Sequence, residues 1–299
     1  MPQPQVISTS RDKVGECPVW DVSGQALYWV DIEGRHIRRW NWAATGEQTW
    51  DLPERVGCIA LSSRGTVIAA MESGVFEVTL GVAPSVTLRL IAAITHREPN
   101  MRFNDGRCDA SGRFWLTTMQ MDMSKGSDVG SLYCLDENGL SPAKLSGLLT
   151  PNGSAFSPDG KTFYLSDSHP RVQKIWAFDF DAQTAGLSGR RLFLDMTSLP
   201  GRPDGAAVDN AGHYWICGND AGQIHKVNPQ GSVVSSLEVP VPKPSMCAFG
   251  GPDMDVLFVA SIPPADAAGN SLDGAMLAFQ CKEKGMPEPR FSRFPVASG

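Results

Sequence analysis

The sequence predicts an all-β fold, a six-bladed β-propeller that occupies residues 1–299 as a single domain. Three observations predict it. A turn-and-strand unit occurs six times, the segments that follow it alternate apolar and polar residues, and no segment has the 3.6-residue period of a helix. The chain is 42% hydrophobic, which supplies enough apolar side chains for a buried core.

Each unit begins with a small or acidic residue, two turn residues and glycine, and continues into a short strand rich in aromatic or β-branched residues. An Asp or Ser at the first position accepts hydrogen bonds from its own backbone, and we expect the Gly to take a positive φ, so the four residues form a tight turn between antiparallel strands. The turns recur about every 46 residues, beginning at Asp21, Ser62, Asp109, Ser157, Asp209 and, in a degenerate sixth copy, Gly251.

A further strand is expected after each unit, in a segment that alternates apolar and polar residues as a half-buried strand does. These segments are 34–41, 74–80, 130–136, 173–180, 222–228 and 274–280. Four short strands in each repeat are typical of a propeller blade, and blades stack around an axis because one twisted sheet cannot bury both of its faces. We expect a strand near Val6–Thr9 to complete the last blade.

One position in each repeat, five residues before the turn, is predicted to face the mouth of the central channel. These positions hold Glu16, Gly57, Asn104, Asn152, Asp204 and Met246. A single Asn-Gly or Asp-Gly is an ordinary turn signal, but four oxygen-bearing side chains at one offset predict a divalent metal site. Carboxylate and amide oxygens suit Ca²⁺ or Mg²⁺, and they also accept Zn²⁺, Mn²⁺ or Fe²⁺.

Composition excludes several classes of function. A formal net charge of −6 argues against a nucleic-acid partner, which requires a basic face. No apolar stretch approaches the ~18 residues of a membrane span, and the N-terminal residues lack the pattern of a secretory signal. Seven widely spaced cysteines with no C-x-x-C pair predict neither a disulfide framework nor a cysteine zinc site. We therefore expect a cytoplasmic protein.

Four segments resemble the SMP-30/gluconolactonase/LRE family of regucalcin-like sugar lactonases. They are GECPVWD at 15–21, RFNDGRCDASGRFWLTTM at 102–119, PNGSAFSPDGKTFYLSDS at 151–168 and RPDGAAVDNAGHYW at 202–215. Their combination, order and spacing are specific, and the resemblance covers essentially the whole chain. It implies a six-bladed propeller that holds one divalent metal ion and takes a small sugar lactone as its partner.

The resemblance also implies roles for individual residues. The family's metal ligands correspond to Glu16, Asn152 and Asp204, and its substrate-contacting residues correspond to Arg102 and Asn104. Arg102 and Asn104 lie two residues apart on a predicted strand, so both can face one pocket.

Two positions depart from the family's pattern. Met121 stands where family members commonly carry an acidic residue that contacts a sugar hydroxyl. Asp122 follows it, but on the other face if the segment is extended. Cys17 replaces the second glycine of a Gly-Glu-Gly motif. The first departure leaves the hydroxyl pattern of the substrate open.

The implied reaction is hydrolysis of an aldonolactone, such as a glucono-, galactono-, xylono- or arabinonolactone, to its aldonic acid. The metal polarises the carbonyl group, and Asp204 is the candidate general base that activates water. Arg102 and Asn104 donate hydrogen bonds to the lactone, and Arg102 then holds the product carboxylate.

Other hypotheses remain open from the sequence. The same metal centre would serve a different lactone or phosphotriester hydrolase, and a non-catalytic calcium-binding scaffold is the third alternative. A scaffold would not require the Arg102–Asn104 pair beside a metal site. For Asn219, which follows a predicted strand, we expect a role in a turn, with lining of the site as the alternative. The metal, the sugar, its ring size and the oligomeric state stay undetermined.

Overall fold

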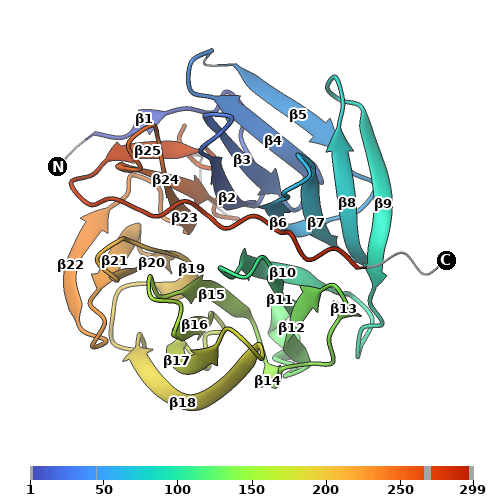
Figure 1. Ribbon diagram of the computed structural model, residues 1–299. Coiled ribbons are helices and arrows are strands. Elements are labelled where there is room, and N and C mark those ends of the chain that lie inside the picture. The colour runs from blue at the N-terminus through green and yellow to red at the C-terminus, as the bar shows by residue number, and fades with distance from the viewer. Residues whose placement is uncertain (1–2, 45, 266–270, 296–299) are drawn as a thin grey trace.

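The computed structural model describes residues 3–44, 46–265 and 271–295. Six antiparallel sheets stand side by side in a ring (Figure 1), which confirms the predicted six-bladed β-propeller. Within the described residues there is no α-helix, and the one 3₁₀ helix, η1, covers Met123–Lys125. That part of the chain also contains no helix long and apolar enough to cross a membrane.

Each sheet runs outward from the axis, and the predicted repeat supplies its inner three strands. The axis is lined by β2 (Gly15–Asp21), β6 (Val56–Leu61), β10 (Met101–Cys108), β15 (Pro151–Phe156), β19 (Arg202–Val208) and β23 (Pro244–Gly250). The second strands are β3 (Ala26–Asp31), β7 (Val67–Met71), β11 (Phe114–Gln120), β16 (Thr162–Asp167), β20 (Tyr214–Asn219) and β24 (Val256–Ser261). The third strands are β4 (His36–Asn41), β8 (Gly74–Leu80), β12 (Gly130–Asp136), β17 (Lys174–Asp181), β21 (Gln223–Val227) and β25 (Leu277–Gln280).

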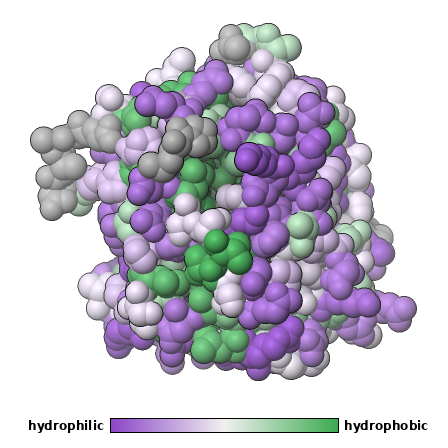
Figure 2. All heavy atoms as spheres, turned by 90° about the vertical axis from the view of Figure 1, so that its left-hand side faces the viewer, coloured by the Kyte–Doolittle hydropathy of each residue, from purple (hydrophilic) through white to green (hydrophobic). Residues whose placement is uncertain are grey.

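The outer edge differs from blade to blade. The outer strands are β5 (Glu47–Asp51), β9 (Val86–Ala93), β18 (Gly186–Asp195), β22 (Val233–Glu238), β1 (Gln5–Val6) and, in the third blade, the pair β13 (Gly139–Leu140) and β14 (Leu145–Leu148). Strand β1 pairs with β25 and closes the ring, as predicted for the N-terminal segment, with the strand itself at Gln5–Val6. Figure 2 shows this side of the ring, where hydrophobic residues gather between hydrophilic ones.

The predicted turns join the first strand of each blade to the second. The side chains of Asp21, Ser62, Asp109 and Asp209 accept a hydrogen bond from the backbone two residues onward. The expected positive φ occurs at Gly65, Gly112, Gly160 and Gly212. The prediction of a positive φ was wrong for Gly24, because the positive φ of that turn falls on the next residue, Gln25, at 44°.

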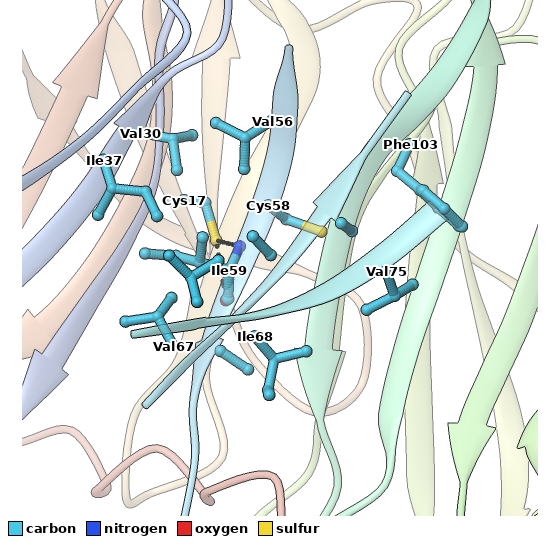
Figure 3. Packing of buried hydrophobic residues seen from close by; sticks show 14 of the residues in the cluster. Cys17, Val30, Ile37, Val56, Cys58, Ile59, Val67, Ile68, Val75 and Phe103 are labelled. Atoms are coloured by element: carbon cyan, nitrogen blue, oxygen red, sulfur yellow. Dashed lines mark hydrogen bonds between the residues drawn. The ribbon is translucent and has the colours of Figure 1, made fainter. Parts of the chain in front are cut away.

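Neighbouring blades bury one another's faces. Every residue of β7 and β24 is buried, because each of these strands packs between two sheets. Figure 3 shows the packing of the first and second blades, where Cys17, Val56 and Ile59 meet Val30 and Ile37. Burial on both faces explains why these strands are nearly continuous apolar runs.

The chain after β25 runs across the ring, as the red segment in Figure 1 shows. Its backbone bonds to three blades: Phe291 N–H donates to Leu61 O at 2.9 Å, Ser292 N–H donates to Gly112 O at 3.0 Å, and Gly285 bridges to Asp209. These partners belong to, or adjoin, the turns that end the first strands. The mouth formed by the beginnings of those strands is therefore at the opposite end of the channel.

Candidate metal centre

The first strand of every blade is irregular at, or directly after, the position predicted to face the channel mouth. Pairing between the first and second strands skips residues at Glu16/Val19, Val56/Cys58, Phe103/Gly106, Asn152/Ala155, Pro203/Ala206 and Pro244/Cys247. Such bulges bend a strand and re-aim a side chain. The six positions are thus structurally equivalent, as the repeat predicted.

The structure brings Arg102, Asn104 and Asn152 into one hydrogen-bonded group. The amide nitrogen of Asn104 donates to the carbonyl of Pro151 at 2.9 Å and to Oδ1 of Asn152 at 3.1 Å. Arg102 donates to Oδ1 of Asn104 at 2.6 Å and to the carbonyl oxygen of Phe103 at 2.9 Å. The Asn104 oxygen accepts from the positively charged guanidinium group of Arg102, whereas the Asn152 oxygen accepts from a neutral amide, so Asn152 is the better cation ligand and Asn104 suits a substrate-contacting role with Arg102.

Asn152 is oriented by a residue that sequence reasoning missed. Its amide nitrogen donates to Oγ of Ser168 at 3.0 Å, and the Ser168 hydroxyl donates to the carbonyl of Pro203. The buried Asn152 side chain therefore has a fixed orientation, with its nitrogen on Ser168 and its oxygen toward Asn104. A signal was present: Ser168 follows β16, and the end of a second strand lies beside the beginning of the first strand.

Glu16 and Asp204 place two carboxyl groups close together in a desolvated site. Burial raises the pKa of Glu16 well above its ordinary value, and the charges of Asp204 and Asp105 raise it further. Burial raises the pKa of Asp204 to about 7, although a hydrogen bond from Asn219 Nδ2, at 2.5 Å to Oδ2, opposes the rise. Ionisation of both carboxyl groups at once is therefore unfavourable unless a positive charge binds between them.

These residues fit a divalent cation. Two carboxylates and the amide oxygen of Asn152 provide the hard oxygen donors that such ions prefer, and a cation relieves the repulsion between Glu16 and Asp204. Throughout the described ranges, no group of three or more His, Cys, Asp or Glu side chains forms a metal cluster. The set at the channel mouth differs from such a cluster because its third donor is an amide.

Met121 lies at the same end of the third blade. Its N–H donates to Asn100 O at 2.9 Å, just beyond the β10–β11 pairing of Met101 with Gln120. Asp122 does not continue an extended segment: it is the exposed N-cap of η1 and accepts from Ser124 N at 3.1 Å. The Asp122 carboxylate is thus committed to its own turn and does not take the place of the acidic residue missing at 121.

The comparisons with known proteins cover nearly the whole chain. It is 34% identical over 283 residues to a 6-deoxy-6-sulfogluconolactonase of Pseudomonas putida, covering 93% of this chain and 95% of that one. It is 30% identical to a pentonolactonase of Haloferax volcanii, covering 96% and 97%. The crystal structure of a calcium-binding protein, regucalcin, of Agrobacterium tumefaciens superposes with a TM-score of 0.89 at 26% identity, covering 97% of each chain. The family model described as SMP-30/gluconolactonase/LRE-like region matches residues 14–263, and the chain belongs to this family.

Proposed function

We propose that the protein is a metal-dependent sugar lactonase, in which Glu16, Asn152 and Asp204 hold one divalent cation. The observation that carries the proposal is the pair of buried carboxyl groups beside an amide oxygen whose direction is fixed by Ser168. The lactonase names of relatives at 30% and 34% identity support the reaction class.

Asp204 is the general base of the proposed reaction. When bound, the cation supplies Lewis acidity, which polarises a lactone carbonyl and lowers the pKa of nearby water. Asp204 accepts the proton of the attacking water, and a bound cation keeps this buried carboxyl group deprotonated so that it can do so. General-base assistance of this kind contributes about 10²–10⁴-fold to a rate.

Arg102 and Asn104 orient the substrate. Among the described residues Arg102 forms no ion pair, and its guanidinium group donates to the Phe103 carbonyl and the Asn104 side chain. Its guanidinium group is therefore available to hold the carboxylate that ring opening produces. Met121 adds an apolar thioether at the same end of the blade, two residues after Met119, which pairs with Arg102, and it favours a substrate that presents carbon or a ring face there.

The apolar Met121 also supports a second candidate, a hydrolase of a less hydroxylated lactone or of a phosphotriester. The two candidates share Asp204 and the cation, so a substrate panel that includes both classes separates them. Preference for polyhydroxylated aldonolactones supports the first candidate, and preference for alkyl lactones or phosphotriesters supports the second.

Asp204→Asn distinguishes an enzyme from a calcium-binding scaffold. The amide keeps an oxygen donor but cannot accept the proton of water, so we expect lactone hydrolysis to fall by at least about 10²-fold while calorimetry still detects metal binding. Asp159→Asn is the matched control, because Asp159 is an exposed turn residue that accepts from Ser157 and Lys161. Undiminished hydrolysis by Asp204→Asn would exclude Asp204 as the base.

A further inference from the structure

Asn219 is the last residue of β20 and pairs with Arg202, two residues before Asp204. Its side chain is only 3% exposed. Ion pairs hold the adjoining corner: Arg202 contacts Asp220 at 2.7 Å, and Lys243 contacts the other oxygen of Asp220 at 3.2 Å. Asn219 is therefore part of a fixed corner beside the general base.

The amide nitrogen of Asn219 restrains Asp204. It donates to Oδ2 of Asp204 at 2.5 Å, so one of the two carboxylate oxygens is occupied by the protein. The other oxygen is left to face the cation and the attacking water. Partners of this kind fix the orientation of a ligating carboxylate, and their loss typically lowers metal affinity or activity by about 10–100-fold.

The amide oxygen of Asn219 is buried and has no hydrogen-bond partner among the described residues. Buried polar atoms in folded proteins are nearly always paired, so an unpaired one beside a site indicates a group that a ligand satisfies. A carbonyl oxygen accepts only, which excludes an anionic group and selects a donor such as a hydroxyl.

We infer that Asn219 is a positioning and specificity residue of the proposed lactonase: its amide nitrogen fixes Asp204, and its amide oxygen accepts a hydrogen bond from one substrate hydroxyl. The half of this inference that concerns the substrate hydroxyl rests on the proposed function. The restraint on Asp204 depends on the metal site alone. A site built to bond a hydroxyl discriminates strongly against the analogue that lacks it, because the buried acceptor is then left unpaired.

Asn219→Leu tests both halves, since leucine has a similar volume and no polar atom. We expect kcat/KM on the preferred aldonolactone to fall by about 10–100-fold, with kcat reduced because Asp204 is less well oriented. On a series of monodeoxy lactones, the loss should shrink by at least about tenfold for the single compound that lacks the contacted hydroxyl. Titration calorimetry with Mn²⁺ and with Ca²⁺ should show the metal Kd rising by about tenfold.

Asn138→Leu is the control, because Asn138 lies in the exposed turn between β12 and β13. Unchanged kcat and unchanged metal Kd in Asn219→Leu would overturn the positioning role. Equal losses on every deoxy lactone would overturn the hydroxyl contact and leave water as the partner of the carbonyl. If the unmodified protein hydrolyses no lactone, the proposed function fails and the hydroxyl contact fails with it, whereas the metal titration still decides whether Asn219 positions Asp204.

Discussion

Cys17 holds the backbone next to Glu16 in a conformation that favours glycine. Its φ is 48°, in the left-handed region, which costs an L-residue about 1–2 kcal/mol. The buried thiol interacts with the backbone of the second blade: Sγ accepts from Ile59 N at 3.2 Å and donates to Ile59 O at 3.4 Å (Figure 3). The departure from glycine is thus compensated by a contact that anchors the Glu16 strand to its neighbour.

Comparing Cys17→Gly with Cys17→Ala separates these two effects. Both variants lose the thiol contacts with Ile59, but only alanine retains the strained φ. We expect Cys17→Gly to be the more stable variant by about 1 kcal/mol, and Cys17→Ala to be less stable than the parent protein by about 1–2 kcal/mol. Urea unfolding measures both values. A Cys17→Ala variant more stable than Cys17→Gly would show that the conformation at this position carries no strain.

The buried carboxyl groups of Glu16 and Asp204 predict a pH-dependent metal affinity. In the metal-free protein burial raises the pKa of both groups, so both contribute folding stability that is full at low pH and lost as the pH rises; for Asp204 this loss is complete above about pH 7. A cation requires the deprotonated forms. The affinity should therefore fall below pH 7, and binding there should release protons.

Calorimetric titrations at pH 6 and pH 8, each in two buffers with different ionisation enthalpies, measure affinity and proton release together. We expect binding about tenfold weaker at pH 6, with proton release that is smaller at pH 8. Equal affinity at the two pH values, with no proton release at either, would show that the cation does not bind through these carboxylates.

At the scale of elements, Arg107 connects three blades to the C-terminal segment. It donates to the carbonyl oxygens of Ser154 and Ala206, which lie two residues after Asn152 and Asp204, and it forms an ion pair with Glu288. The strands that carry two of the three proposed ligands, Asn152 and Asp204, are thus connected to each other and to the C-terminal segment.

Glu288→Gln tests this connection. The substitution leaves a buried guanidinium without its carboxylate, so we expect the free energy of unfolding to fall by about 2 kcal/mol, less than for a fully buried pair because the Glu288 side chain is 21% exposed. The control is Glu283→Gln in the same segment, whose more exposed pair with Lys226 should contribute under about 1 kcal/mol. Denaturant unfolding measures both, and equal losses would contradict a special role for the Arg107–Glu288 pair.

For the whole molecule, the repeat in the sequence predicted six blades and the equivalence of six positions at the channel mouth. Turn residues at a regular spacing determine both, and periodicity is a local signal. The partners of the proposed ligands and of Cys17 were not predictable in the same way. Ser168, Asn219 and Ile59 are 16, 15 and 42 residues from the side chains that they contact, and these contacts depend on the bulges of the first strands.

The path of the C-terminal segment was also missed by sequence reasoning. Its contacts reach Leu61 and Gly112, far back in the chain, and the segment itself has little regular pairing for periodicity to predict. The expectation for Asp122 assumed an extended segment, whereas the side chain of this residue caps a 3₁₀ turn instead. The capping hydrogen bond of Asp122 therefore ends the strand at this point.

Metal-dependent hydrolysis of a sugar lactone is decided by one assay on the full chain. Protein stripped of metal with a chelator is supplied with one divalent ion at a time, and acid release from a panel of aldonolactones is followed above the spontaneous rate. We predict turnover of one or two lactones that appears only with added metal and saturates near one equivalent, as expected for a single site at Glu16, Asn152 and Asp204. Tight metal binding without turnover of any lactone would contradict the proposed function.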